Sequence, residues 1–333
     1  MIVKMSDVAR QAGVSEKTVS NALNGHPSMR QETRRRVLET AERLGYIRND
    51  SARALRSGRS RTIGLVLPEL RNPFFAELAD AIMDNAESRG YKVVIHQSKG
   101  SRERELESLR RGALGALDGI LLHALALGDA DTDRIVGGLP LVLLGDRFSG
   151  TPADHVTMAN ADAARTMTDH LIDRGHRRIA VVGAHRGDHT SSAGLRLQGH
   201  REALLRHGIE YDEDLIRYTD GWHRLDGVES TAALLESGTD FDAVFALNDM
   251  LALGAMSTLR ARGITVPEDV SVVGFDDIEE ARYTLPALTT IDPGTATIAR
   301  ASVERLLARI AGDSSRPERL KSPFTIQLRG SSR

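Results

Sequence analysis

Carboxylate, amide and aromatic side chains recur directly after apolar, strand-like runs in this chain of 333 residues. Carboxylates and amides bind hydroxyl groups through paired hydrogen bonds, and an aromatic ring packs on the apolar C–H face of a polyol ring. Trp222 is the one tryptophan of the sequence and also follows such a run, so it is either a second binding ring or an ordinary packed side chain. Together these residues predict a binding site for a hydroxyl-rich small molecule. They are Phe74, Phe75, Asp146, Arg147, Asn248, Asp249, Asp276 and Asp277.

An enzymatic site is the alternative, but the sequence lacks the motifs that would support one. No histidine belongs to a His-Glu-x-x-His metal pair, Gly112-Ala-Leu-Gly115 lacks the third glycine of a dinucleotide loop, and neither Gly-x-Ser-x-Gly nor Gly-Lys-Ser occurs. With no cysteine, thiolate ligands and thiol nucleophiles are excluded. The adjacent carboxyl groups of Asp276 and Asp277 diverge on an extended segment, so only one is expected to face a ligand. We expect no catalytic residue, no metal site and no cofactor.

The elements that would position the binding residues begin at Thr62, where apolar strands start to alternate with amphipathic helices. This alternation is typical of parallel sheets covered by helices on both faces. It runs through two similar series and predicts an α/β core of two doubly wound, parallel-sheet subdomains. The expected N-terminal subdomain comprises residues 61–159 and 292–322, and the C-terminal subdomain comprises 160–291 and 323–333. Because ligands bind beyond the carboxyl ends of parallel strands, the residues named above would line a cleft between these halves.

Residues 6–24 have the pattern of two short helices joined by a tight turn. Val8 and Ala12 lie on one apolar face, and Gly13 ends the first helix because glycine accepts a left-handed backbone. Ser15 can cap the second helix, whose outward side chains are polar. Such a pair is either an ordinary αα-hairpin or a helix-turn-helix whose second helix enters a DNA major groove.

The charge of the chain changes sign beyond this region. Residues 1–61 contain 13 Lys and Arg against 6 Asp and Glu, whereas residues 62–333 contain 31 against 40. A basic head of net charge +7 on an acidic body of net charge −9 indicates a polyanionic partner for the head. The segment 49–61 is either a flexible linker or a helix that folds on DNA, with Leu55 as a wedge between base steps of the minor groove.

No apolar run reaches the length of about 18 residues that a transmembrane helix needs, and the N-terminus lacks the apolar core of a secretory signal. The absence of cysteine is compatible with a reducing compartment. We therefore expect a cytoplasmic protein with no membrane partner.

Motifs spread over essentially the whole chain resemble, in order and spacing, those of the LacI/GalR family of transcriptional regulators. In the head they are Asp-Val-Ala…Ala-Gly-Val-Ser…Thr-Val-Ser at 7–20 and Ala-Arg-Ala-Leu at 52–55. In the core they are Asn72-Pro-Phe-Phe75, Gly175-His-Arg-Arg-Ile179, Arg196-Leu-Gln-Gly199, Leu247-Asn-Asp249, Gly274-Phe-Asp-Asp277 and Leu288-Thr-Thr-Ile291. The resemblance implies a small all-α helix-turn-helix head over residues 1–60, with a hinge helix at 50–58. It also implies a periplasmic-binding-protein-like core for effector binding and dimerisation over residues 61–333.

Position by position, the resemblance implies contacts to DNA and to the effector. The implied DNA contacts are Ser15, Glu16, Lys17, Thr18, Asn21, Ser51, Arg53, Leu55 and Arg56. The implied effector contacts are Phe74, Phe75, Asp146, Arg147, Arg196, Trp222, Asn248 and Asp276. Lys17 would donate to guanine, Asn21 would pair with an adenine edge or a phosphate, and Glu16 would accept from a cytosine amino group. Arg147 departs from the family pattern and indicates either an anionic effector or an ion pair near Asp146.

The function that the resemblance implies is that of a repressor, bound as a homodimer to a pseudo-palindromic operator in double-stranded DNA. A small effector between the two core subdomains would switch the operator affinity. Trp222 and the carboxylate and amide groups favour a sugar or sugar derivative, and a nucleoside or purine effector is the alternative. A solute-binding protein without a regulatory role would share the core but would have no use for the basic head. Whether the effector releases or recruits DNA stays open at this point.

Overall fold

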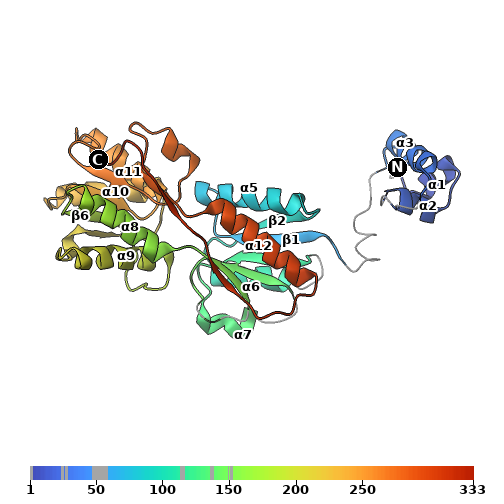
Figure 1. Cartoon of the computed structure of the whole chain (residues 1–333), viewed down its shortest axis with the longest axis horizontal. Coiled ribbons are helices and arrows are strands. Elements are labelled where there is room, and N and C mark those ends of the chain that lie inside the picture. The colour runs from blue at the N-terminus through green and yellow to red at the C-terminus, as the bar shows by residue number, and fades with distance from the viewer. Residues whose placement is uncertain are drawn as a thin grey trace. The chain divides into compact units, whose positions relative to one another are not determined.

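Figure 1 shows the computed structural model of the chain, which describes residues 3–23, 26, 29–46, 59–112, 117–135, 139–148, 150 and 153–333. The chain divides into two compact units, Met1–Ser60 and Arg61–Arg333. The predicted hinge helix at 50–58, with Ser51, Arg53, Leu55 and Arg56, lies outside the described residues. In the part of the chain that is described, no helix is both long and apolar enough to cross a bilayer.

The first unit packs three described helices around a small apolar core. They are α1 (Met5–Ala12), α2 (Glu16–Leu23) and α3 (Gln31–Arg43). Val8, Val19 and Val37, one from each helix, are completely buried where the helices meet. Gly13 ends α1 with φ of 64°, and Ser15 Oγ accepts a hydrogen bond of 3.2 Å from the backbone N–H of Thr18 in the first turn of α2. The helix–turn–helix geometry predicted for this stretch is therefore present.

The second unit begins with a six-stranded parallel sheet, which we call, with its helices, the N-lobe. Its strands run in the order β11-β5-β4-β3-β1-β2. Their bounds are β1 (Thr62–Leu67), β2 (Lys92–Gln97), β3 (Gly119–His123), β4 (Leu141–Leu144), β5 (Asp154–Thr157) and β11 (Arg319–Lys321). Helices α5 (Pro73–Glu87) and α12 (Thr295–Ile310) cover one face, where Leu78 and Ile82 of α5 pack on Ile63 and Leu65 of β1. The opposite face is covered by α6 (Arg102–Arg111), η2 (Asp129–Asp131) and α7 (Thr132–Ile135).

A four-stranded parallel sheet in the order β7-β6-β8-β9 forms the second lobe, the C-lobe. Its strands are β6 (Ile179–Ala184), β7 (Ile216–Tyr218), β8 (Ala243–Ala246) and β9 (Ser271–Val273). Helices α8 (Asn160–Asp173) and α9 (Ser192–Arg206) pack together, as do α10 (Arg224–Glu236) and α11 (Asp249–Ala261), and Figure 1 shows the two pairs on opposite sides of β6. Gly199 permits the close approach of α9 to α8, because a Cβ there would collide with the backbone of Ala161. Short helices η3 (Glu213–Leu215) and η4 (Glu279–Arg282) complete the lobe.

The chain passes between the lobes three times within the described residues. It leaves β5 for α8, leaves β10 (Thr290–Asp292) for α12, and returns from β11 to β12 (Thr325–Gln327). Strands β10 and β12 pair in antiparallel fashion between the two sheets. The alternating α/β pattern and the two parallel sheets predicted from the sequence are thus confirmed, and the carboxyl ends of β1, β2, β3, β6, β7 and β9 lead to one pocket.

Candidate functional site

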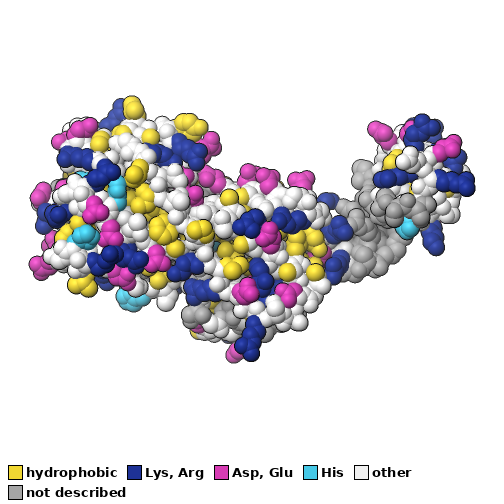
Figure 2. Space-filling model, viewed as in Figure 1, with side chains coloured by type: hydrophobic (Ala, Val, Ile, Leu, Met, Phe, Trp, Pro, Cys, Tyr) yellow, Lys and Arg dark blue, Asp and Glu magenta, His cyan; other side chains and the backbone are white. Residues whose placement is uncertain are grey.

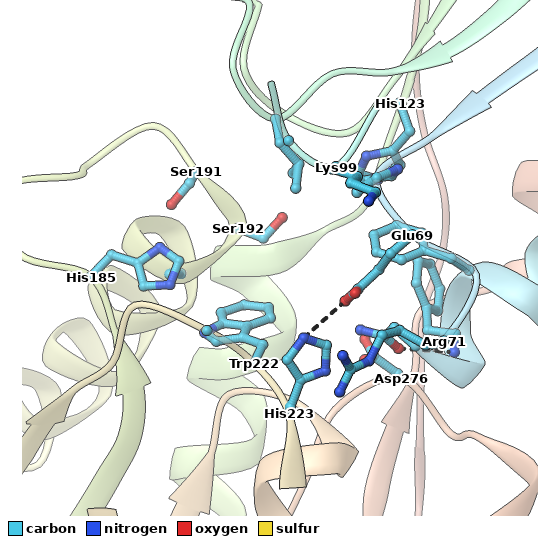
Figure 3. Close-up of a pocket in the computed structure, with 18 of the residues that line it drawn as sticks. Glu69, Arg71, Lys99, His123, His185, Ser191, Ser192, Trp222, His223 and Asp276 are labelled. Atoms are coloured by element: carbon cyan, nitrogen blue, oxygen red, sulfur yellow. Dashed lines mark hydrogen bonds and ion pairs between the residues drawn. The ribbon is translucent and has the colours of Figure 1, made fainter. Parts of the chain in front are cut away.

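A pocket of about 570 Å³ lies between the two lobes, lined by residues of both (Figure 3). From the N-lobe come segments that follow β1, β2 and β3, and from the C-lobe come the start of α9 and segments that follow β6, β7 and β9. The N-lobe residues are Pro68, Glu69, Arg71, Asn72, Phe74, Phe75, Gln97, Lys99, Gly100, His123 and Leu125. The C-lobe residues are His185, Ser191, Ser192, Ala193, Arg196, Asp220, Gly221, Trp222, His223 and Asp276, and Met158 lies in the connection between the lobes.

Arg196 is the buried cation of this pocket, with 2% of its surface exposed. Its Nε donates to Asn160 Oδ1 at 2.7 Å, and Nη1 donates to the carbonyl oxygen of Leu247. The guanidinium carbon lies 3.4 Å from the ring centre of Phe275 and 5.1 Å from that of Trp222. Because every one of these partners is held by the fold, the guanidinium has a fixed direction before any ligand arrives.

Asp276 is the carboxylate that faces Arg196, with 3.6 Å between Oδ1 and Nη2. Burial raises the pKa of Asp276 to about 7, and the nearby guanidinium of Arg196 opposes that rise. Behind it, burial and the neighbouring Asp276 raise the pKa of the completely enclosed Asp249, which accepts hydrogen bonds from Thr290 Oγ1 and from the backbone N–H of Ile278. Asp277 turns away and pairs with Arg329 at 2.5 Å, so only one of the adjacent carboxylates faces the pocket, as expected.

Trp222 is positioned by two hydrogen bonds to the ends of neighbouring strands. Its Nε1 donates to the carbonyl oxygen of Gly183 at 2.7 Å, and its own carbonyl oxygen accepts from Asn248 Nδ2 at 3.1 Å. Asn248 also caps α11, because its Oδ1 accepts from the backbone N–H of Leu251 at 2.8 Å. Asn248 is completely buried and does not line the pocket, so the structure gives this predicted contact residue the role of holding Trp222 in place.

Asp146 and Arg147, which were also predicted as effector contacts, lie beside the pocket and not on its wall. Asp146 Oδ2 accepts from Asn160 Nδ2 and, at 3.5 Å, from the hydroxyl of Ser192 at the start of α9. Burial raises the pKa of Asp146 to about 6 against the opposing charge of Arg196. Arg147 pairs with Asp188 of the C-lobe at 3.1 Å. Of the two alternatives for Arg147, the structure therefore contains the ion pair, and its partner is Asp188.

The two predicted aromatic residues of the N-lobe stand at the start of α5. Asn72 Oδ1 accepts from the backbone N–H of Phe74 at 3.1 Å and Pro73 occupies the first turn, so this cap fixes where the helix begins. The rings of Phe74 and Phe75 meet edge to face at 5.3 Å, and Phe75 meets the imidazole of His123 at 5.0 Å. Both phenylalanines line the pocket.

The first unit offers a second candidate site on α2. Ser15, Glu16 and Lys17 are exposed, whereas Thr18 and Asn21 are half-buried, so all five present at least part of their surface to solvent. Exposed arginines on α3 add positive charge to this unit, which Figure 2 shows among its dark blue side chains. They are Arg34, Arg35, Arg36 and Arg43. Such a surface can meet a phosphate backbone with its cations and base edges with its polar side chains.

Comparison with known proteins identifies both units. The model for bacterial regulatory proteins of the lacI family matches residues 4–49, and the model for a periplasmic binding protein-like domain matches residues 168–332. The HTH-type transcriptional regulator CelR of Thermobifida fusca is 36% identical over 337 residues, covering 97% of this chain and 96% of its own length. The chain belongs to the LacI family. It is accordingly a helix-turn-helix transcriptional regulator that binds DNA.

Solved structures of LacI-family proteins match this fold over its full length. A complex of the regulator CelR with cellobiose has a TM-score of 0.73 and 33% identity, covering 99% of this chain and all of that one. The lac repressor dimer bound to its operator and to the anti-inducer ONPF has a TM-score of 0.86 and 28% identity, covering all of this chain and 99% of that one. The pocket and the first unit are therefore parts of a LacI-family fold.

Several polar pocket residues of this LacI-family core were not singled out from the sequence. Glu69, Gln97, His123 and His185 each stand at or just after the carboxyl end of a strand, which is the same position that marked the predicted residues. The spacing of the histidines in the sequence matches no metal or catalytic motif, and spacing carries no information about hydroxyl binding. Glu69 Oε1 and Nε2 of His223 lie 3.3 Å apart across the pocket, the contact drawn as the dashed line in Figure 3. Such a contact between lobes has no signature in the sequence.

Proposed function

We propose that this LacI-family protein is a repressor whose operator affinity is switched by a sugar or sugar derivative bound between the lobes. The observation that carries the proposal is the buried pair of Arg196 and Asp276 beside Trp222. A guanidinium and a carboxylate held in fixed directions bind vicinal hydroxyl groups, and the indole face packs on the apolar side of a pyranose ring. The cellobiose complex of the relative CelR supports a carbohydrate over a nucleoside.

Charge in the pocket also supports an uncharged ligand. Around the lining, Arg71, Lys99 and Arg196 stand against Glu69 and Asp220, and Asp276 adds its charge above a pKa of about 7, so the cations exceed the anions by at most one. An anionic effector would need a larger excess of cations, and Arg147, which lies beside the pocket, is already paired with Asp188. A neutral sugar needs no net compensating charge.

On the DNA side, α2 is proposed to enter the major groove. Lys17 would donate to O6 and N7 of guanine, Asn21 would contact an adenine edge or a neighbouring phosphate, and Glu16 would accept from a cytosine amino group. Ser15 and Thr18 would contact phosphates. For the hinge at 50–58 we propose that Leu55 inserts between base steps of the minor groove, flanked by Ser51, Arg53 and Arg56.

Switching would act through the lobes. A homodimer on a pseudo-palindromic operator needs two head units at a fixed spacing. We propose that the angle between the lobes sets this spacing, so a ligand that favours one angle changes the population of the DNA-competent state. Couplings of this kind are typically about 1–3 kcal/mol, which corresponds to roughly 5–150-fold in operator affinity. The protein would work in the cytoplasm and catalyse no reaction.

The test is fluorescence anisotropy of a duplex selected from a random pool by the full-length protein, titrated with and without monosaccharides and disaccharides. Asp276→Asn is expected to abolish the response to sugar while leaving operator binding intact. Asp240→Asn is the matched control, because the side chain of Asp240 is 90% exposed and lies far from the pocket lining. A change of operator affinity in either direction supports the proposal, and an operator affinity that no sugar alters contradicts it.

A further inference from the structure

Three imidazoles of the pocket lining keep a buried ring nitrogen without a hydrogen-bond partner among the residues that the structure describes. One is His223, whose other ring nitrogen already contacts Glu69 at 3.3 Å, and the other two lie on opposite walls. The nitrogens of these two are Nδ1 of His123, at the end of β3 in the N-lobe, and Nε2 of His185, just after β6 in the C-lobe. His123 is only 6% exposed. Buried polar atoms are normally paired, and an unpaired one costs stability unless something else provides the partner. The χ2 torsion of histidine is broad, so a small rotation of either ring suffices to present its nitrogen to a molecule in the pocket.

The environment of these two rings favours hydroxyl groups as partners. Burial lowers the pKa of His123 to about 4, and burial also lowers the pKa of His185. Both rings are therefore neutral near pH 7, and a neutral imidazole carries one donor and one acceptor. A hydroxyl group offers the complementary pair. A phosphate could use only the donor of a neutral ring and would lose the charge-assisted hydrogen bond that a cation provides.

Each imidazole is accompanied by an aromatic ring of its own lobe. His123 meets Phe75 at 5.0 Å with an angle of 78° between the rings, and His185 meets Trp222 at 5.6 Å with an angle of 44°. Figure 3 shows His185 and Trp222 together on one side of the pocket and His123 with Lys99 on the other. An aromatic face next to a hydroxyl-binding group is what one pyranose ring requires. The pocket holds two such pairs.

The size of the pocket agrees with two rings. At about 570 Å³ it lies well inside the range of roughly 300–1,000 Å³ that is typical of pockets for ligands larger than a single hexose. Because ligand pockets enclose most of their ligand's surface, an occupant of two linked rings matches this volume better than a single ring does.

We propose that the effector is a carbohydrate of two linked pyranose rings, one held by His185 and Trp222 beside Arg196 and the other by His123 and Phe75. This rests on the proposed function, in which the pocket binds a sugar. The ring in the C-lobe provides the contact to Arg196 and Asp276. The ring in the N-lobe distinguishes a disaccharide from a monosaccharide, because His123 forms hydrogen bonds to hydroxyl groups that a monosaccharide in the C-lobe subsite does not have.

The experiment is isothermal titration calorimetry of the full-length protein with paired probes: glucose against cellobiose and maltose, galactose against lactose, and xylose against xylobiose. We expect at least one disaccharide to bind tenfold or more tightly than its constituent monosaccharides. If a monosaccharide binds as tightly as its disaccharides, the two-ring inference is overturned while the sugar-responsive function stands. If no carbohydrate binds, both are overturned.

Variants locate the second ring. His123→Leu is expected to weaken the disaccharide about tenfold and to leave monosaccharide affinity unchanged, whereas His185→Leu weakens both. His123→Asn keeps a polar atom near the Nδ1 position and is expected to restore part of the loss, which a purely structural role of His123 would not predict. His207→Leu is the matched control, because His207 is an exposed histidine outside the pocket lining. Equal losses of both ligand types in His123→Leu would overturn the assignment of His123 to the second ring.

Discussion

Replacing Asp276 by asparagine is expected to remove a specific pH dependence from the stability of the core. In the folded protein, burial raises the pKa of Asp276 from its ordinary value of 3.8 to about 7. Between about pH 4 and pH 7 the folded state therefore keeps a proton that the unfolded chain has released. Stability is then largest at the acid end of this window and falls as the pH rises, by about 1.4 kcal/mol per pH unit. Over the whole window the loss is of order 4 kcal/mol.

Asparagine cannot titrate, so Asp276→Asn lacks this pH-dependent loss of stability. The free energy of unfolding of the variant, minus that of the parent protein, should therefore increase as the pH rises from about 4 to 7. Urea unfolding followed by Trp222 fluorescence measures this, because Trp222 is the one tryptophan of the sequence and is partly buried against the hydrophobic core. Asp146, whose pKa burial raises to about 6, gives a slope of the same sign but is present in both proteins. Asp240→Asn, at an exposed carboxylate, should show the parent's slope. Parallel curves for Asp276→Asn and the parent would refute the assignment of the raised pKa to Asp276.

The same contacts make further outcomes measurable. Glu69→Gln removes the carboxylate charge from the 3.3 Å contact with His223 and should raise the dissociation rate of a bound sugar a few-fold in stopped-flow fluorescence. An unchanged rate would count against a role of this contact in holding the lobes closed over the sugar. Asp146→Asn should leave sugar affinity within about threefold while reducing the sugar's effect on operator anisotropy, since Asp146 is off the pocket wall but bonded to Asn160 and Ser192. Simultaneous loss of sugar affinity would place Asp146 among the ligand contacts instead. Leu55→Ala should weaken the selected operator far more than a random duplex in gel-shift titrations, and equal losses would exclude the wedge.

The sequence predicts most of the fold because its hydrophobic patterns and helix-ending residues are consistent with the architecture that the chain adopts. The alternation of strands and helices from Thr62 onward and the helix end at Gly13 both appear where the pattern predicts them. The sequence does not indicate strand β11, since Arg319, Leu320 and Lys321 contain one apolar residue and pair with β5 alone at the sheet edge. Its pairing is a tertiary event that no local pattern announces.

For the pocket, the rule that ligands meet strand ends predicts Phe74, Phe75, Trp222 and Asp276, which line it, and Arg196 on α9 comes only from the family resemblance. The rule does not distinguish a side chain that faces the pocket from one that supports it from behind. Asn248 follows a strand as closely as Asp276 does, but its hydrogen bonds to Leu251 and to Trp222 turn it inward. That distinction depends on side-chain direction at a helix cap, which only three-dimensional packing decides.

Contacts between the lobes surround the pocket, so filling it acts on them directly. Arg147 pairs with Asp188 at 3.1 Å, Glu77 Oε1 accepts from the backbone N–H of Glu279 at 2.9 Å, and Asp146 accepts from Ser192 of the C-lobe. Arg196 belongs to this set through Asn160, which it shares with Asp146. In the proposed function, a sugar hydroxyl that bonds to Asp276 would change the field at Arg196, and Asn160, which bonds both Arg196 and Asp146, would carry that change toward the contacts between the lobes. We therefore expect ligand binding and the angle between the lobes to depend on the same few side chains.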